Sequence, residues 1–281
     1  MEIIRRVRSM KEVCRQVRNN GRKVGFVPTM GCLHEGHLSL IRRVKELADI
    51  VVVSIFVNPT QFGPNEDYEA YPRDSAGDAD LCIAEEVDYL FMPTVEEMYP
   101  RGSQTYVEVN EISRILEGAT RPGHFRGVTT VLTKLFEIIH PTLVGLGQKD
   151  AQQAVVVKRM VSDLMMDFEV LVLPTVREED GVAMSSRNRL LAPEQRRAAA
   201  AIPRALDAAR EALAAGQRQP ATIVDVAREA LAGEEQLEVD YVELVHAESL
   251  ARAMELEGDM LLLVAVKVGD IRLIDNTYLR V

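Results

Sequence analysis

The sequence predicts an α/β protein with a doubly wound parallel sheet and a smaller C-terminal α+β domain. Short apolar segments alternate with amphipathic helical segments over the first two-thirds of the 281 residues. Ile50–Val57 is a nearly continuous β-branched run, which is typical of a parallel strand buried on both faces. The last third combines an Ala- and Arg-rich helical segment with a strand pattern of alternating polarity, which indicates a separate domain.

The elements of the first two-thirds follow one another as strand, helix, strand. Lys23–Val27 is a short apolar strand, and the next segment, Leu38–Ala48, places Leu40, Ile41 and Val44 on one helical face. The alternation continues with strands expected at 50–57, 88–92, 143–146 and 168–173, and helices at 78–86, 128–139 and 154–164. Because alternating strands and helices favour right-handed crossovers, we expect a Rossmann-like sheet.

The last third has a different pattern. Pro193–Ala215 is expected to form one helix and Ala221–Ala232 a second, with a break at 216–220 between them. Strands are expected at 238–245, 261–267 and 271–275, and the turn signal Gly269-Asp270 joins the last two. We therefore divide the chain into a Rossmann-like domain, 1–176, and a smaller α+β domain, 177–281.

Composition excludes several classes of protein. A net charge of −10 argues against a nucleic-acid partner, because such proteins neutralise phosphates with clustered Lys and Arg. Cys14, Cys32 and Cys82 are scattered and lack CxxC spacing, which argues against a disulfide framework or a zinc site. The first residues lack the apolar core of a signal peptide, and the longest apolar run, Met260–Val266, is far too short to span a membrane. We therefore expect a cytoplasmic protein with no membrane partner.

The segment Pro28–His37 is the strongest functional signal. It lies between a predicted strand and a predicted helix, where doubly wound sheets bind phosphate groups on the helix N-terminus. His34 and His37 flank Gly36 there, and Gly31 precedes them. Glycines permit close approach of a ligand to the backbone, and imidazoles can donate to phosphate oxygens. We interpret the segment as a phosphate site; the alternative is that both histidines only satisfy the start of the helix.

Three further strand ends carry polar groups. Asn58 and Gln61 have amides that suit a ligand with hydroxyl and carboxylate groups, although an Asn-Pro turn is the alternative. Lys149 follows the strand at 143–146, and Asp150 is placed to cap the next helix. Met184–Arg187 offers hydroxyls and a guanidinium to a phosphate, or is a plain surface loop. Together these segments indicate an anion-binding crevice.

Two other features have open interpretations. Asp78 could help to hold Mg²⁺ through its oxygens, or it could lie on a solvated helix face. The loop before the helix at 128–139 contains Arg121, His124 and Arg126 among glycines. This loop is either an anion clamp or mobile lid, or a basic surface loop.

The chain resembles the pantoate–β-alanine ligase family, and the match is collinear over essentially its whole length. Four segments carry the resemblance: Pro28–His37, Ser54–Gly63, Gly147–Gln153 and Val182–Asn188. The His-x-Gly-His motif alone is shared with a wider nucleotidyltransferase superfamily, whereas the other three segments are specific to this family. The sequence departs from the family at Cys32, where alanine is commoner, and at Val144-Gly145-Leu146, where aromatic residues are frequent.

The resemblance implies a two-step reaction. (R)-pantoate and MgATP would form pantoyl adenylate and pyrophosphate, and β-alanine would then displace AMP to give pantothenate. No organic prosthetic group is implied. The domain at 1–176 would bind nucleotide and pantoate, the domain at 177–281 would act as a lid, and the protein would be a homodimer.

The resemblance also implies roles for individual residues. His37, His34 and Lys149 would be catalytic, with His37 as a donor to the leaving phosphate oxygens. Gln61, Gln153 and Asn58 would bind pantoate and β-alanine, and Asp78 would contact Mg²⁺ directly or through water. The loop at 184–187 would close over the triphosphate, like the mobile KMSKS loop of class I aminoacyl-tRNA synthetases. The residues implied for ATP are Met30, Gly31, His34, Gly36, His37, Gly147, Gln148, Lys149, Asp150, Val176, Met184, Ser185, Ser186 and Arg187.

Two rival interpretations stay open. One is another transferase of the superfamily, which would move AMP or CMP onto a phosphorylated acceptor and use Arg121 and Arg126 as a second anion site. The other is a nucleotide-binding scaffold without catalysis. The intact His37, Lys149 and Arg187 argue against the scaffold.

Overall fold

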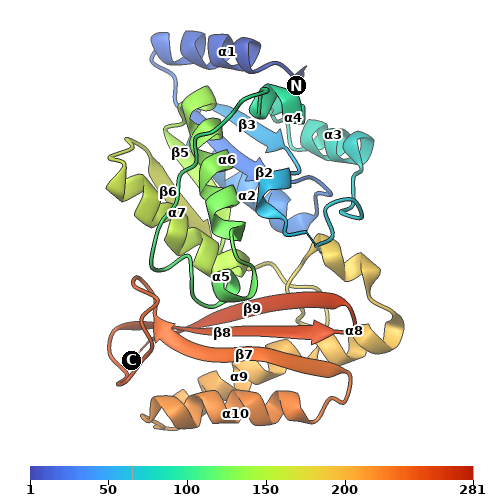
Figure 1. The fold of residues 1–281 in the computed structure, drawn as a ribbon, viewed down its shortest axis with the longest axis vertical. Helices are drawn as coiled ribbons and strands as arrows, with labels where there is room; N and C mark the ends of the chain where they lie inside the picture. The colour runs from blue at the N-terminus through green and yellow to red at the C-terminus, as the bar shows by residue number, and fades with distance from the viewer. Residues whose placement is uncertain (65, 281) are drawn as a thin grey trace. The chain divides into compact units, whose positions relative to one another are not determined.

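The computed structural model describes residues 1–64 and 66–280. The chain forms two compact units (Figure 1). The N-terminal unit contains Met1–Gly147 and Val156–Leu173, and the C-terminal unit contains Gln148–Val155 and Pro174–Val281. The short segment at 148–155 therefore clusters with residues that follow it much later in the chain.

The N-terminal unit is built on a six-stranded parallel sheet, which confirms the predicted fold class. Its strand order is β1-β4-β3-β2-β5-β6. The order reverses direction between β2 and β5, and in such sheets ligands bind beyond the carboxyl ends of the strands at this switch point. The strands are β1 (Glu2–Ile4), β2 (Val24–Thr29), β3 (Ile50–Ile55), β4 (Tyr89–Phe91), β5 (Leu143–Gly147) and β6 (Glu169–Leu173).

Helices connect these strands, and most begin a few residues earlier than the sequence pattern predicts. The α-helices are α1 (Val7–Asn19), α2 (Glu35–Lys45), α3 (Ser75–Ala84), α4 (Val95–Met98), α5 (Glu117–Thr120), α6 (His124–Ile139) and α7 (Ala151–Asp163). Two 3₁₀ turns follow strand ends: η1 (Pro59–Gln61) and η2 (Gln148–Asp150). The early starts place His37, Asp78, His124 and Gln153 in the first turns of their helices.

Two glycines let α2 pack tightly on the sheet. A Cβ on Gly25 in β2 would lie 2.3 Å from Cγ1 of Val44, and one on Gly145 in β5 would lie 2.8 Å from Cγ2 of the same residue. Val44 is fully buried, so α2 sits directly over β2 and β5. This packing explains why a small residue stands at 145, and it fixes the N-terminus of α2 relative to the sheet.

The C-terminal unit contains an antiparallel sheet with strand order β7-β8-β9, covered by helices, as predicted (Figure 1). The single helix expected at 193–215 is two helices, because Pro203 has no N–H to continue the helical ladder back to Ala199. The elements are η3 (Ser186–Leu190), α8 (Pro193–Ala199), α9 (Ala201–Ala214), α10 (Pro220–Ala232), β7 (Leu237–His246), β8 (Asp259–Val268) and β9 (Ile271–Arg280).

Candidate functional site

His34 and His37 lie at the start of α2, directly beyond the carboxyl end of β2. His34 is the N-cap residue, and its Nδ1 accepts the backbone N–H of Gly36 at 3.2 Å. Nδ1 of His37 accepts the backbone N–H of His34 at 3.3 Å. The two rings lie with their centroids 4.1 Å apart. Both histidines therefore do cap the helix, as the alternative interpretation held, and the capping bonds fix the orientation of both rings.

The capping bonds also determine which nitrogen carries the proton. A backbone N–H can only donate, so Nδ1 of each ring must be the acceptor. In the neutral imidazole the proton then lies on Nε2. Capping and phosphate binding are thus compatible, because the first uses Nδ1 of each ring and the second would use the Nε2–H group.

The turn before His34 is held by Asp78 of α3. Gly31 has φ +88° and Cys32 has φ +52°, a left-handed conformation that non-glycine residues rarely adopt. Oδ2 of Asp78 accepts the N–H of Cys32 at 2.8 Å, and Oδ1 accepts the N–H of Leu33 at 2.6 Å. The Asp78 side chain is 3% exposed. This carboxylate therefore stabilises the turn that carries the histidines.

The bonds to Cys32 and Leu33 use one acceptor position on each Asp78 oxygen, and the predicted contact of Asp78 with Mg²⁺ stays a prediction. Among the described residues, no group of three or more His, Cys, Asp or Glu side chains could hold a metal ion. The alternative of a solvated helix face is wrong, since Asp78 is buried.

Asn58 fixes the orientation of Gln61 at the end of β3. Oδ1 of Asn58 accepts the N–H of Thr60 and the hydroxyl of Tyr99, and its Nδ2 donates to the carbonyl of Gly127. These partners determine which end of the Asn58 amide is nitrogen. Nδ2 also donates to Oε1 of Gln61 at 3.1 Å, so Gln61 is left with its Nε2 as a donor.

Asn58 itself is poorly placed to contact a substrate. It is 1% exposed, and both ends of its amide are used by the four partners just described. Gln61 is 8% exposed, and its Nε2 lies 3.1 Å from Sδ of Met30, which is only a weak acceptor. Of the two amides, Gln61 is therefore the one that can offer donors to a ligand.

The basic loop before α6 is not arranged as an anion clamp. Arg121 forms two bonds with the carboxylate of Glu66, and Arg126 lies over the ring of Tyr106, 4.9 Å from its centroid. Burial and the charge of Arg121 lower the pKa of His124 to about 4, so this imidazole is neutral. Two of the three cations of this loop are therefore poorly suited to an anion, since Arg121 is paired with Glu66 and His124 is neutral, which argues against the second anion site of the rival transferase.

In the C-terminal unit, Asn276 of β9 holds the segment that carries Lys149. Its Nδ2 donates to the carbonyls of Gln148 and Lys149 at 2.8 and 3.0 Å, and its Oδ1 accepts Nε2 of Gln148 at 3.1 Å. Asn276 is 1% exposed. The Lys149 ammonium lies 3.3 Å from Oδ1 of Asp150. Gln153 is half-buried in the first turn of α7.

A small hairpin brings Val176 and Met184 together. The N–H of Met184 donates to the carbonyl of Val176 at 3.0 Å, and the tip of the hairpin contains Gly181 at φ +85°. Ser185 then caps η3, because its Oγ accepts the N–H of Arg187. Five of the residues implied for ATP, Val176, Met184, Ser185, Ser186 and Arg187, therefore belong to one structured segment of the C-terminal unit.

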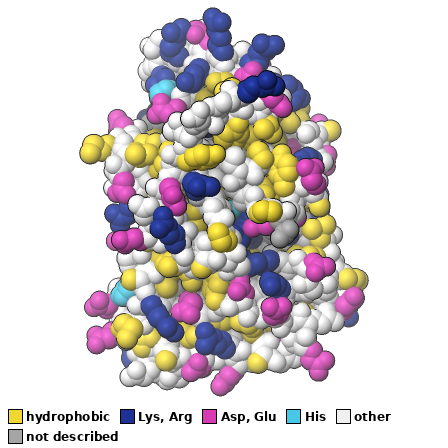
Figure 2. Space-filling view, in the orientation of Figure 1, with side chains coloured by type: hydrophobic (Ala, Val, Ile, Leu, Met, Phe, Trp, Pro, Cys, Tyr) yellow, Lys and Arg dark blue, Asp and Glu magenta, His cyan; other side chains and the backbone are white. Residues whose placement is uncertain are grey.

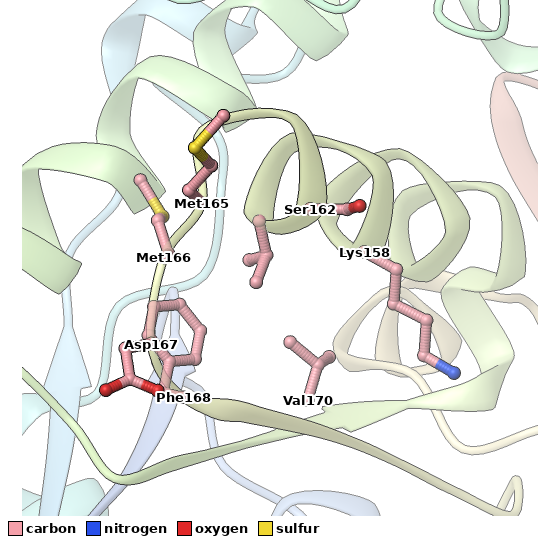
Figure 3. Close-up of a pocket in the computed structure, with 8 residues that line it drawn as sticks. Lys158, Ser162, Met165, Met166, Asp167, Phe168 and Val170 are labelled. Atoms are coloured by element: carbon pink, nitrogen blue, oxygen red, sulfur yellow. The ribbon is translucent and has the colours of Figure 1, made fainter.

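Two cavities of the N-terminal unit lie elsewhere. One, of about 550 Å³, is lined by Lys158, Met166 and Phe168 near the amino end of β6, opposite the end that binds ligands in such sheets (Figure 3). The other, of about 590 Å³, lies against α1, where Figure 2 shows Lys and Arg side chains gathered at the top of the view. No predicted site residue lines either cavity. None of the helices in the described part of the chain is long and apolar enough to cross a membrane.

Comparisons with known proteins place this geometry in a family context. A family model described as pantoate-beta-alanine ligase matches residues 2–278. The chain is 53% identical to the pantothenate synthetase of Pelotomaculum thermopropionicum over 279 residues, which cover 99% of each chain. It is 50% identical to the pantothenate synthetase of Pseudothermotoga lettingae, again over 99% of each chain.

Solved structures give the same result. The crystal structure of pantothenate synthetase from Thermus thermophilus aligns with a TM-score of 0.95 and 44% identity over 99% of both chains. The pantoate-beta-alanine ligase of Francisella tularensis, a complex with β-γ ATP and β-alanine, aligns with a TM-score of 0.79 and 34% identity over 99% of this chain and 97% of that one.

Proposed function

The chain belongs to the pantoate–β-alanine ligase family, and from this premise we propose which of its residues perform each part of the family's reaction. The enzyme condenses (R)-pantoate with β-alanine, while ATP is cleaved to AMP and pyrophosphate. In the first step a carboxylate oxygen of pantoate attacks the α-phosphorus, and pyrophosphate leaves. In the second step the amine of β-alanine attacks the acyl carbon, the bond to the AMP oxygen breaks, and the amine loses a proton.

In this reaction the protein must align the substrates and supply hydrogen-bond donors, and it does not need to supply a nucleophile. The substrates supply both nucleophiles, so the protein must hold the carboxylate in line with the α-phosphorus and stabilise the negative charge that grows on the phosphate oxygens. The observation that carries our assignment is that Nδ1 of both histidines at the start of α2 accepts a backbone N–H, from which we infer an Nε2–H donor on each ring. His34 and His37 act as neutral donors to those oxygens, and the helix N-terminus adds its own positive potential.

Further donors come from the C-terminal unit. The Lys149 ammonium contacts phosphate oxygens, and Ser185, Ser186 and Arg187 close over the triphosphate. Support comes from the residue types and from their rigid mounting, since Asn276 holds the backbone at Lys149. The other residues assigned to ATP are Met30, Gly31, Gly36, Gly147, Gln148, Asp150, Val176 and Met184.

Gln61 and Gln153 bind pantoate, and β-alanine binds near Gln61. The network around Asn58 supports the first assignment, because it makes Gln61 present an N–H donor, which suits the carboxylate and hydroxyl oxygens of pantoate. Asn58 acts through Gln61 rather than on the substrate, which corrects the direct contact expected from the sequence.

Three further properties belong to the proposal. Mg²⁺ would enter with ATP as MgATP, and Asp78 is the residue we expect to contact it, directly or through water. The cytoplasm is the expected compartment, and Cys14, Cys32 and Cys82 are buried free thiols. The homodimer is carried over from the family, and sedimentation of the purified chain tests it.

A matched pair of variants tests the role of the histidines. His37→Asn keeps an acceptor near the position of Nδ1 and lacks the Nε2–H donor, whereas His37→Ala lacks both. Pyrophosphate release that depends on pantoate should fall by about 100- to 1,000-fold in both variants, as for other lost donors to a developing charge. Only the alanine variant should also lose cap stability, by about 1 kcal/mol. A His37→Asn enzyme with near-normal turnover would refute the donor role.

The identity of the product separates the ligase from its rivals. With pantoate and ATP alone, the enzyme should release pyrophosphate and retain a pantoyl adenylate, which mass spectrometry detects. Addition of β-alanine should convert it to pantothenate and AMP. Transfer of a nucleotide to a phosphorylated acceptor would indicate the rival transferase, and nucleotide binding without any turnover would indicate a scaffold.

A further inference from the structure

A chain of hydrogen bonds runs from Glu66 through Arg121 and His124 to the backbone carbonyl of Gln61, and the proposed reaction uses none of these three side chains. The carboxylate of Glu66 accepts two bonds from Arg121, at 2.8 Å to Nε and 2.5 Å to Nη2. Nη1 of Arg121 lies 3.2 Å from Nε2 of His124. Nδ1 of His124 lies 2.8 Å from the carbonyl oxygen of Gln61.

The direction of each bond in this chain follows from its ends. A guanidinium can only donate, so Nε2 of His124 accepts from Arg121 and carries no proton. The proton of the neutral ring is therefore on Nδ1, which donates to the Gln61 carbonyl. The ring is thus fixed in one tautomer, opposite to that of His34 and His37, and its only two polar atoms are both used within the protein.

Close packing holds the same backbone from a second side. His124 is the first residue of α6, and Gly127 lies one turn further along that helix. A Cβ on Gly127 would lie 2.4 Å from the carbonyl oxygen of Thr60 and 2.6 Å from N and Cα of Gln61. The start of α6 therefore presses directly on the turn that carries Gln61, and the bond from His124 sets the direction of the Gln61 peptide.

We propose that His124 is a positioning residue for pantoate, which fixes the Gln61 backbone so that the Gln61 amide meets the substrate, with Arg121 and Glu66 fixing His124 in turn. The inference rests on the proposed contact between Gln61 and pantoate. This role explains why a histidine occupies position 124. Its imidazole accepts a hydrogen bond from a guanidinium at one ring nitrogen and donates one to a carbonyl at the other. The same role assigns the loop at 121–127 to the positioning of Gln61 rather than to a second anion site.

Two conservative variants separate this role from general stability. His124→Asn places its amide nitrogen near Nδ1 and can still donate to Gln61, whereas His124→Gln places its amide near Nε2 and keeps the contact with Arg121. KM for pantoate should rise by about tenfold in His124→Gln, the effect of one lost hydrogen bond, and by less than about threefold in His124→Asn. KM for ATP should stay within about twofold in both. Arg126→Gln, in the same loop but at a side chain that packs on Tyr106, is the matched control and should change neither constant.

A double variant identifies which assignment fails if the result differs. Gln61→Ala should raise KM for pantoate, and adding His124→Gln to it should cause no further rise, because both changes remove the same contact. If Gln61→Ala leaves KM for pantoate unchanged, the proposed contact of Gln61 with pantoate is wrong, and the positioning role of His124 is wrong as well. If Gln61→Ala raises KM but the two His124 variants are equal, or if KM for ATP rises equally, the positioning role of His124 alone is overturned.

Discussion

Replacing His124 with Gln should make the stability of the protein less sensitive to mild acid. Burial and the positive charge of Arg121 lower the pKa of His124 from its ordinary value of 6.5 to about 4, against smaller opposing effects of the Gln61 carbonyl, Glu66 and Glu117. Below pH 6.5 the unfolded chain therefore takes up a proton at this position that the folded chain does not bind until about pH 4.

The sign and size of the effect follow from that difference. Stability must fall as the pH decreases through this window, because the unfolded state binds more protons than the folded state. A shift of this size corresponds to about 3 kcal/mol in total, and about 2 kcal/mol of it is lost by pH 5. His124→Gln removes the titrating group, so the difference in unfolding free energy between the two proteins should change by about 2 kcal/mol between about pH 7 and about pH 5.

Urea denaturation followed by far-UV circular dichroism measures this difference, since the chain has no tryptophan to report by fluorescence. An NMR titration of the five histidines measures the pKa of His124 directly, and His124→Gln identifies its resonance by loss. The reasoning is refuted if His124 titrates near its ordinary pKa of 6.5, or if the two proteins lose the same stability over this pH range.

Substitutions at four further positions test the hydrogen-bond networks. His34→Asn should keep the cap of α2, whereas His34→Ala should lower the free energy of unfolding by about 1 kcal/mol. Equal unfolding free energies for the two variants in urea denaturation would contradict the capping role of His34. Asp78→Asn puts an amide nitrogen against a backbone N–H and should cost about 3 kcal/mol; a loss below about 1 kcal/mol in urea would show that the turn does not need the carboxylate. Asn276→Asp cannot donate to the two backbone carbonyls that it faces and should lower both stability and pyrophosphate release, so normal turnover would argue against its hold on Lys149. Ser54→Ala removes a buried hydroxyl that lacks a partner among the described residues. The substitution should therefore raise the free energy of unfolding by up to about 1 kcal/mol, which calorimetry measures; a decrease would contradict this.

The regular elements of this fold could be predicted because their patterns are local. The strand expected at 50–57 is β3 at Ile50–Ile55, and the run of β-branched residues that indicated it is fully buried at Val51, Val52 and Val53. The helix α1 received no prediction, although Met10, Cys14 and Val17 recur at helical spacing and form its buried face. The local signal for this helix is therefore present in the sequence, and the same periodicity that predicts α2 could have predicted it.

The partners of the polar residues could not be predicted in the same way. Asp78 holds Cys32 from 46 positions away, and Asn276 holds Gln148 from 128 positions away. Local periodicity carries no information about such contacts, because they depend on which strand ends the topology brings together. A polar residue type at a strand end therefore indicates that a ligand site is near, and it does not say whether that residue contacts the ligand or holds its neighbour.

Low exposure marks the residues that hold a neighbour in place. Asn58, Asp78 and Asn276 are each at most 3% exposed, and each bonds to the segment that carries a residue assigned to a substrate. A buried polar group is stable only when its bonds are made, and a saturated network is also rigid. Donors mounted on such networks need little reorganisation when charge develops on a phosphate, which is the condition for strong electrostatic stabilisation. Asn58 and Asp78, which the sequence suggested as contacts of substrate and Mg²⁺, each hold a segment that carries a proposed donor.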